Sequence, residues 1–180
     1  STRVYTETEK SGHAWFSVGE GDDLTIYTYG ENRDGETKPS GILHKYSGKA
    51  AHKYLELKAK TNYTVHVITD VEDAQVATIA DNMLNSSNKI IRKEEGEGYS
   101  IDSREVGEYT LFGNNCTTLT SDVLNQSGSK ALNGTIYQQS SSFGTWTTIP
   151  LQHRFILPTS LQKHLNSMSK GNNNGVLRRK

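Results

Sequence analysis

The chain has 180 residues, and its 20 Lys and Arg residues balance 20 Asp and Glu residues, so the formal net charge is zero. This balance does not favour a global attraction to nucleic acid or to an anionic membrane. Mean hydropathy is low at -0.68, and no apolar run approaches the ~20 residues of a membrane span, so we expect no stable membrane insertion. We expect one domain over residues 1–180, with its core at about 12–168 and a flexible tail at 169–180.

Two alternating segments near the N-terminus predict a β-hairpin. Residues 12–18 place Ala14, Phe16 and Val18 on one face, and residues 24–29 alternate in the same way. A Gly- and Asp-rich turn at 19–23 separates them. Symmetric pairing about that turn would put His13 opposite Tyr29.

The spacing of apolar residues changes in the middle of the chain. Residues 31–50 are polar and glycine-rich and predict a long loop, 51–60 fit either a strand or a short helix, and 63–69 predict a buried strand. Apolar residues then recur at helical spacing from Val76 to Leu84. Thr69 and Glu72 have the spacing of a capping box for that helix.

The second half of the chain predicts two helices. Residues 86–98 are charged and predict a loop, and a weak strand precedes Cys116. A helix begins at Cys116, with Gly128 as its stop. Residues 129–148 are rich in Ser, Thr and Gln and predict irregular structure. A last helix runs from Pro158 to about Met168, with Leu161 and Leu165 inward.

Cys116 is the only cysteine, which excludes an intrachain disulfide. A thiol at a helix N-terminus meets free backbone N–H groups and the positive end of the helix dipole, and both favour the nucleophilic thiolate. A buried small side chain and an intermolecular bridge are the other interpretations.

A thiol nucleophile needs a base, and six histidines are available: His13, His44, His52, His66, His153 and His164. His13 stands out because it follows Gly12 and shares the polar face of a strand with Trp15. His66 sits in an apolar strand and is interpreted as a structural residue. No pair or cluster has metal-ligand spacing, so we expect no metal and no cofactor.

The order of these motifs resembles a known superfamily. The segment 12–18, then Thr28-Tyr29-Gly30, and much later Asn114-Asn115-Cys116 are similar to the circularly permuted papain-like, NlpC-type cysteine peptidases and amidases. The resemblance spans most of residues 12–165. It implies an α+β, papain-like fold in which an antiparallel sheet packs against the helix that bears the cysteine.

The resemblance also implies roles for individual residues. Cys116 would be the nucleophile and His13 the general base. A polar residue on the next strand would orient the imidazole, and Tyr29 is our candidate, with Tyr27 and Thr28 as further options, because no Asp, Glu, His or Asn stands on residues 24–29. The Cys116 backbone N–H and the Asn115 side chain would bind the oxyanion, with Tyr109 in support.

The function implied is hydrolysis of an amide bond in peptidoglycan stem peptides by an antibacterial toxin. Related domains are type VI secretion effectors, which implies action in the target-cell periplasm and a cognate immunity protein as partner; no signal peptide is visible. Two alternatives stay open. One is a lipid acyl hydrolase or acyltransferase like lecithin–retinol acyltransferase, which would need an apolar patch that no stretch of the sequence indicates. The other is an inactive binding module.

Overall fold

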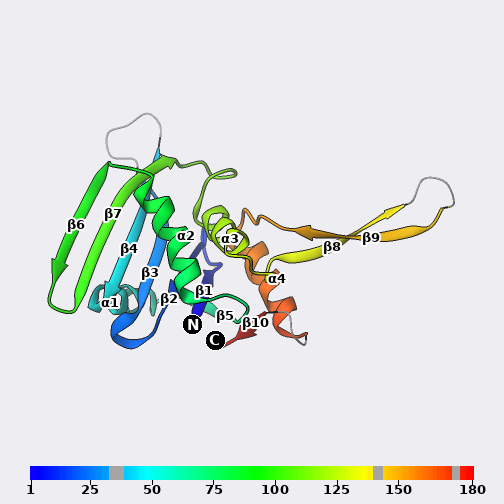
Figure 1. Cartoon of the computed structure of the whole chain (residues 1–180), viewed down its shortest axis with the longest axis horizontal. Coiled ribbons are helices and arrows are strands. Elements are labelled where there is room, and N and C mark those ends of the chain that lie inside the picture. The colour runs from blue at the N-terminus through cyan, green and yellow to red at the C-terminus, as the bar shows by residue number, and fades with distance from the viewer. Residues whose placement is uncertain (33–38, 140–143, 172–174) are drawn as a thin grey trace.

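The computed structural model describes residues 1–32, 39–139, 144–171 and 175–180. Over these residues the fold is mixed α+β, with one large antiparallel sheet and a separate two-stranded ribbon (Figure 1). The strands are β1 (Thr2–Glu7), β2 (His13–Val18), β3 (Thr25–Asn32), β4 (Ser40–Gly48), β5 (Tyr63–Ile68), β6 (Ile90–Gly96), β7 (Tyr99–Glu108), β8 (Asn133–Gln139), β9 (Trp146–Gln152) and β10 (Val176–Arg178). The helices are α1 (Lys49–Lys58), α2 (Asp73–Asn85), α3 (Cys116–Gln126) and α4 (Pro158–Ser169), with a short 3-10 turn at Gly21–Asp23.

The sheet has the strand order β10-β5-β1-β2-β3-β4-β7-β6, and both of its faces are covered by helices. One face packs on α2, α3 and α4 and forms the larger core, with Phe16, Tyr27 and Leu43 among its buried residues. The other face packs on α1 around Trp15 and Ile26. The sheet therefore separates two hydrophobic cores.

The predicted hairpin is present as β2 and β3, but its register differs by one residue from the symmetric expectation. Phe16 pairs with Tyr27 and Val18 with Thr25. The 3-10 turn at Gly21–Asp23 takes up the difference, because it adds a helical turn to the connection. The ladder ends at Phe16, so the two strands are no longer paired where His13 stands.

Two segments predicted to be loops are strands. β4 lies inside the expected loop at 31–50, and its polar residues have partners on other elements: His44 Nδ1 is 2.7 Å from Ser103 Oγ on β7, and Lys45 pairs with Asp81 on α2 at 2.9 Å. β6 lies inside the expected loop at 86–98. It is an edge strand, where charged residues are exposed and protect the edge from pairing with other chains.

The helices agree more closely than the strands do with the structure that the spacing of apolar residues predicts. The ambiguous segment at 51–60 is α1, and α2, α3 and α4 carry the predicted apolar residues inward. Gly128 follows α3 with φ +84, as its predicted stop position requires. The N-cap of α2 is Glu72, without the predicted capping box. None of the helices in the described residues combines the length and apolar character that a membrane crossing needs.

The core extends beyond the expected range of 12–168 at both ends. β1 stands between β2 and β5, and β10 adds to the edge at β5, with Val176 opposite Ile68. The segment 169–180, expected to be a flexible tail, is thus partly fixed by main-chain hydrogen bonds. Residues 129–148 were expected to be irregular, but β8 and β9 form a paired ribbon that extends away from the body (Figure 1).

The turn between β6 and β7 approaches the backbone of Gly48 closely, and a substitution at Gly48 tests how much stability depends on this contact. The φ of Gly48 is +62, and a Cβ atom would lie 2.2 Å from the carbonyl oxygen of Gly98. We expect Gly48→Ala to lower the free energy of unfolding by more than ~2 kcal/mol in urea titrations. Gly128→Ala is the control, because it shares a positive φ but meets no atom within 4 Å; it should cost only ~1 kcal/mol. Equal losses would contradict this explanation.

Candidate functional site

The start of α3 is held by a capping box built on Asn115. Its side-chain oxygen accepts hydrogen bonds from the backbone N–H groups of Thr117 and Thr118, both at 2.9 Å. The Thr118 hydroxyl in turn accepts from the Asn115 N–H at 2.8 Å. Cys116 is therefore fixed as the first helical residue, as its motif predicted, and its side chain is only 6% exposed.

The amide nitrogen of Asn115 ties two further segments to this helix end. It donates to the carbonyl oxygen of Leu111 at 2.7 Å and to that of Ile156 at 3.0 Å. Both of its N–H groups are thus used. The expectation that the Asn115 side chain donates to an oxyanion is not supported by this arrangement, because the group already caps the helix and joins the two segments.

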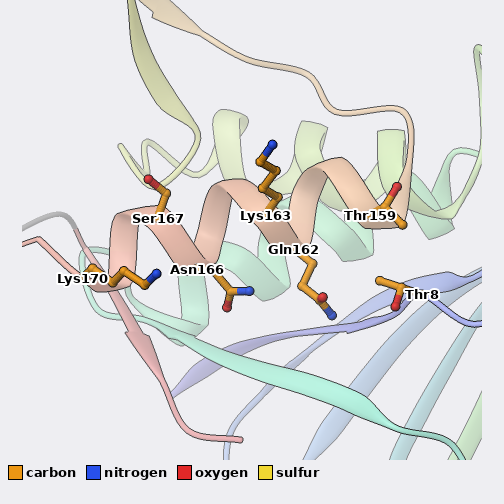
Figure 2. Close-up of a pocket in the computed structure, with 7 residues that line it drawn as sticks. All are labelled: Thr8, Thr159, Gln162, Lys163, Asn166, Ser167 and Lys170. Atoms are coloured by element: carbon orange, nitrogen blue, oxygen red, sulfur yellow. The ribbon is translucent and has the colours of Figure 1, made fainter.

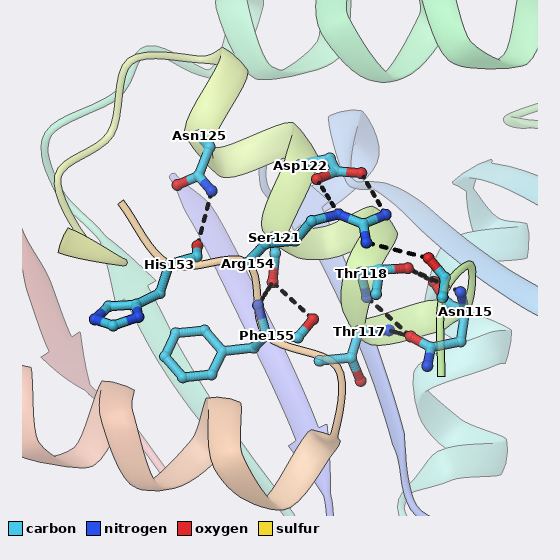
Figure 3. A network of polar contacts seen from close by, with 10 residues as sticks. Asn115, Thr117, Thr118, Ser121, Asp122, Asn125, His153, Arg154 and Phe155 are labelled. Atoms are coloured by element: carbon cyan, nitrogen blue, oxygen red, sulfur yellow. Dashed lines mark hydrogen bonds and ion pairs between the residues drawn. The ribbon is translucent and has the colours of Figure 1, made fainter. Parts of the chain in front are cut away.

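The segment that follows β9 lies along α3 and is fastened to it at several points (Figure 3). Asn125 Nδ2 donates to the carbonyl of His153 at 2.8 Å, and the N–H of Phe155 donates to Ser121 Oγ at 3.0 Å. Arg154 makes a bidentate pair with Asp122 at 2.8 and 3.1 Å and also donates to the Gly113 carbonyl at 3.1 Å. These contacts hold the loop before Cys116 and the segment after β9 in one fixed arrangement.

His13 lies at the first position of β2, on the α1 face of the sheet. Its ring stacks on Trp15 with centroids 5.5 Å apart, and Nε2 is 2.7 Å from the Thr28 hydroxyl. Burial lowers the pKa of His13 to about 4; Lys58 adds to this effect and Glu7 opposes it. The imidazole is therefore neutral near pH 7, which is the form that accepts a proton.

Thr28, rather than Tyr29, contacts the His13 imidazole. Tyr29 points to the other face of the sheet, where its hydroxyl donates to the carbonyl of Val106 and is 3.3 Å from Asn114 Nδ2. Burial raises the pKa of Tyr29 to about 12, so it stays protonated. The predicted orienting role therefore fits Thr28, and Tyr29 instead supports the loop that carries Asn114.

Cys116 and His13 belong to opposite faces of the sheet. Cys116 is part of the larger core, whereas His13 lies beside the α1 core. Within the described residues no hydrogen bond joins the thiol to the imidazole, and the contact recorded for Sγ is Thr117 Oγ1 at 3.7 Å.

Tyr54 links the two groups. Its hydroxyl is 3.3 Å from the Thr28 hydroxyl, which contacts His13. Burial raises the pKa of Tyr54, the hydrogen bond with Thr28 opposes the rise, and Cys116 is among the neighbours that add to it. We call His13, Thr28, Tyr54 and Cys116 the polar cluster. Sequence reasoning missed Tyr54 because its segment had no clear secondary structure.

Tyr109 lies against Cys116, as its predicted supporting role requires. Burial raises the pKa of its hydroxyl, the Cys116 thiol adds to the rise, and the Cys116 backbone N–H opposes it. The hydroxyl is thus close to both the thiol and the N–H group that an oxyanion would use. A substrate oxyanion must displace this hydroxyl or share the donor with it.

Two grooves lie along α4 and between α2 and α3, and no residue of the polar cluster lines either of them. The larger, of about 490 Å³, follows α4 from Thr159 to Lys170, with Thr8 beside its start (Figure 2). That end is near His13, because β1 pairs Glu7 with His13 and Pro158 lies against Gly12. The second groove, of about 430 Å³, reaches Asn114 between α2 and α3.

An exposed apolar surface also adjoins the site, although no stretch of the sequence indicated one. Leu111 and Phe112 are 64% and 70% exposed, and Ile156 and Leu157 are 38% and 44% exposed. These four residues, which we call the apolar rim, come from two short segments that only the fold brings together.

In the described part of the chain, no group of three or more His, Cys, Asp or Glu residues is placed to hold a metal ion.

Comparisons with protein families, curated proteins and solved structures find nothing that matches this chain.

The burial of His13 predicts a specific loss of stability in acid. The unfolded chain binds a proton at this imidazole below its ordinary pKa of 6.5, but the folded chain does so only near 4. Stability contributed by the neutral ring is therefore complete above about pH 6.5 and is lost as the pH falls towards 4. Relative to His13→Gln, we expect the wild type to lose roughly 1 kcal/mol per pH unit between pH 6 and 4.5 in urea titrations. Parallel curves for the two proteins would contradict the prediction.

Proposed function

We propose that the protein is a cysteine hydrolase that cleaves an amide bond through an acyl-enzyme at Cys116. The observations that carry the proposal are a thiol at a capped helix N-terminus and a buried neutral imidazole whose Nε2 lies 2.7 Å from the Thr28 hydroxyl. A thiol, a base and a backbone donor are the groups that acyl transfer needs.

The reaction has two half-reactions. His13 takes the proton of the Cys116 thiol, Sγ attacks the carbonyl carbon, and the oxyanion binds at the Cys116 N–H after Tyr109 moves aside. The protonated imidazole then gives its proton to the departing amine as the carbon–nitrogen bond breaks, which leaves a thioester. A water molecule, deprotonated by His13, attacks this thioester and releases the acid and the thiol.

The substrate class we propose is the stem peptide of peptidoglycan, on the strength of the resemblance to permuted NlpC-type enzymes. The groove along α4 supports this choice, because Lys163 and Lys170 suit the free carboxylates of such peptides. The same resemblance leads us to propose a toxin that acts in the periplasm of a target cell and is neutralised by an immunity protein in the producing cell.

The direct test measures new primary amines released from purified peptidoglycan. We expect Cys116→Ala to reduce the rate by at least a thousandfold, while Leu57→Ser, an exposed substitution on α1, leaves it unchanged. Circular dichroism confirms the fold of both variants. Amine release by Cys116→Ala at the wild-type rate would exclude the thiol mechanism, and no release by any folded protein would exclude this substrate.

A second candidate is hydrolysis or transfer of a lipid acyl group, and the apolar rim is the observation that favours it. Acyl chains need apolar surface close to the nucleophile, and Asn115, the residue before Cys116, holds the rim backbone at Leu111 and Ile156. Release of fatty acid from phospholipid vesicles, with no release of amines from peptidoglycan, would favour the lipid substrate. An inactive binding module would act on neither.

Thr28 should act as a positioning residue for His13. Thr28→Val removes the hydroxyl that contacts Nε2, so we expect kcat to fall about tenfold with KM unchanged, because the imidazole loses its fixed orientation. Thr28→Ser keeps a hydroxyl and should recover most of the rate. Thr25→Val on the same strand is the matched control. A loss that Thr28→Ser does not recover would point to packing rather than orientation.

A further inference from the structure

The apolar rim surrounds the start of α3. Leu111 and Phe112 precede Cys116, and Ile156 and Leu157 precede α4. The carbonyl groups of Leu111 and Ile156 meet at one nitrogen atom, Nδ2 of Asn115. The two exposed pairs therefore stand on neighbouring segments, although Leu111 and Ile156 are 45 positions apart in the sequence.

The backbone beneath the rim is fixed rather than loose. The bidentate pair of Arg154 with Asp122 and the hydrogen bond from Arg154 to Gly113 brace its two segments against α3 (Figure 3). Four large apolar side chains thus stay exposed on backbone segments that an ion pair and a hydrogen bond hold in place. Clustered exposure of this kind marks an interaction surface, since it gains nothing for folding.

The ribbon of β8 and β9 leads directly into the rim. No Asp, Glu, Lys or Arg occurs from Ala131 to Gln152, in a chain of which 22% of residues are charged. The ribbon extends from the body (Figure 1), and Trp146 and Leu151 on β9 are exposed. A two-stranded ribbon is only marginally stable alone in water, so both its composition and its isolation indicate a partner that carries little net charge.

Two protein partners fit these features less well than a lipid surface does. A strand added along β9 would meet Pro150, which has no N–H to donate. A folded protein on the ribbon would find no charged side chain from Ala131 to Gln152 with which to pair. A bilayer surface accepts Trp and apolar side chains at its interface and needs no opposite charge.

We propose that the apolar rim and the β8–β9 ribbon dock the protein on the interfacial region of a lipid bilayer. The protein enters the bilayer no deeper than the interfacial region, because unpaired strand edges are not tolerated in the hydrocarbon core. Docking holds the thiol of Cys116 at the membrane surface. The inference goes beyond the proposed function and does not depend on which acyl bond is cleaved.

The test is sedimentation with sucrose-loaded vesicles of phosphatidylcholine, which carry no net charge. We expect the wild type and Cys116→Ala to sediment with the vesicles equally at low and high salt. The double variant Leu111→Ser/Phe112→Ser should bind at least tenfold more weakly. The matched control is Leu57→Ser/Leu177→Ser, which removes two exposed leucines far from the rim and should bind as the wild type does.

Three outcomes would overturn the proposal: wild-type protein that stays in the supernatant at every lipid concentration, equal losses in the rim and control variants, or a rim variant that binds normally. Analytical ultracentrifugation tests the protein alternative, because a dimer that the rim variant disperses would assign the surface to a second copy. If the double variant does not fold, Ile156→Ser alone replaces it. Binding by inactive Cys116→Ala separates this proposal from that of catalysis.

Discussion

Four hydrogen bonds of one amide side chain, that of Asn115, organise the candidate site. Its oxygen caps α3, and its nitrogen joins the carbonyl groups of Leu111 and Ile156. The cap fixes Cys116 as the first residue of the helix, at the positive end of the helix dipole, and it uses the N–H groups of Thr117 and Thr118. The same side chain sets the position of the loop before Cys116 and of the segment before α4. The nucleophile and the apolar surface beside it therefore share one support.

The second constraint is that the pairing of β2 with β3 ends before it reaches His13. Their ladder ends at Phe16, so His13 lies beyond the paired residues, on the α1 face. Hydroxyl groups adjoin both candidate residues: Thr28 contacts His13, Tyr54 contacts Thr28, and Tyr109 lies against Cys116. Burial keeps the imidazole neutral.

The sequence was sufficient for features that depend on local pattern, and less so for those that depend on neighbours. Periodicity identified the helix at Cys116 and the β2–β3 hairpin, but not the register, because the 3-10 turn shifts it by one residue. That shift places Thr28 rather than Tyr29 beside His13. β4 looked like a loop because its polar residues find their partners on elements distant in the sequence, His44 at Ser103 of β7 and Lys45 at Asp81 of α2. The sequence did not indicate the apolar rim, because its residues form two short pairs that are distant from each other along the chain. The papain-like fold and its chemistry remain proposals based on resemblance.

The central claim is that Cys116 carries the acyl group during turnover, and mass spectrometry after acid quench tests it most directly. During a single turnover of a soluble stem-peptide substrate, the account predicts a transient mass increase equal to the acyl half of the substrate. The added mass should map to the peptide that contains Cys116, and hydroxylamine should remove it, as expected for a thioester. An acyl group on another residue, or product formed at the full rate with Cys116 unmodified at every quench time, would contradict the account.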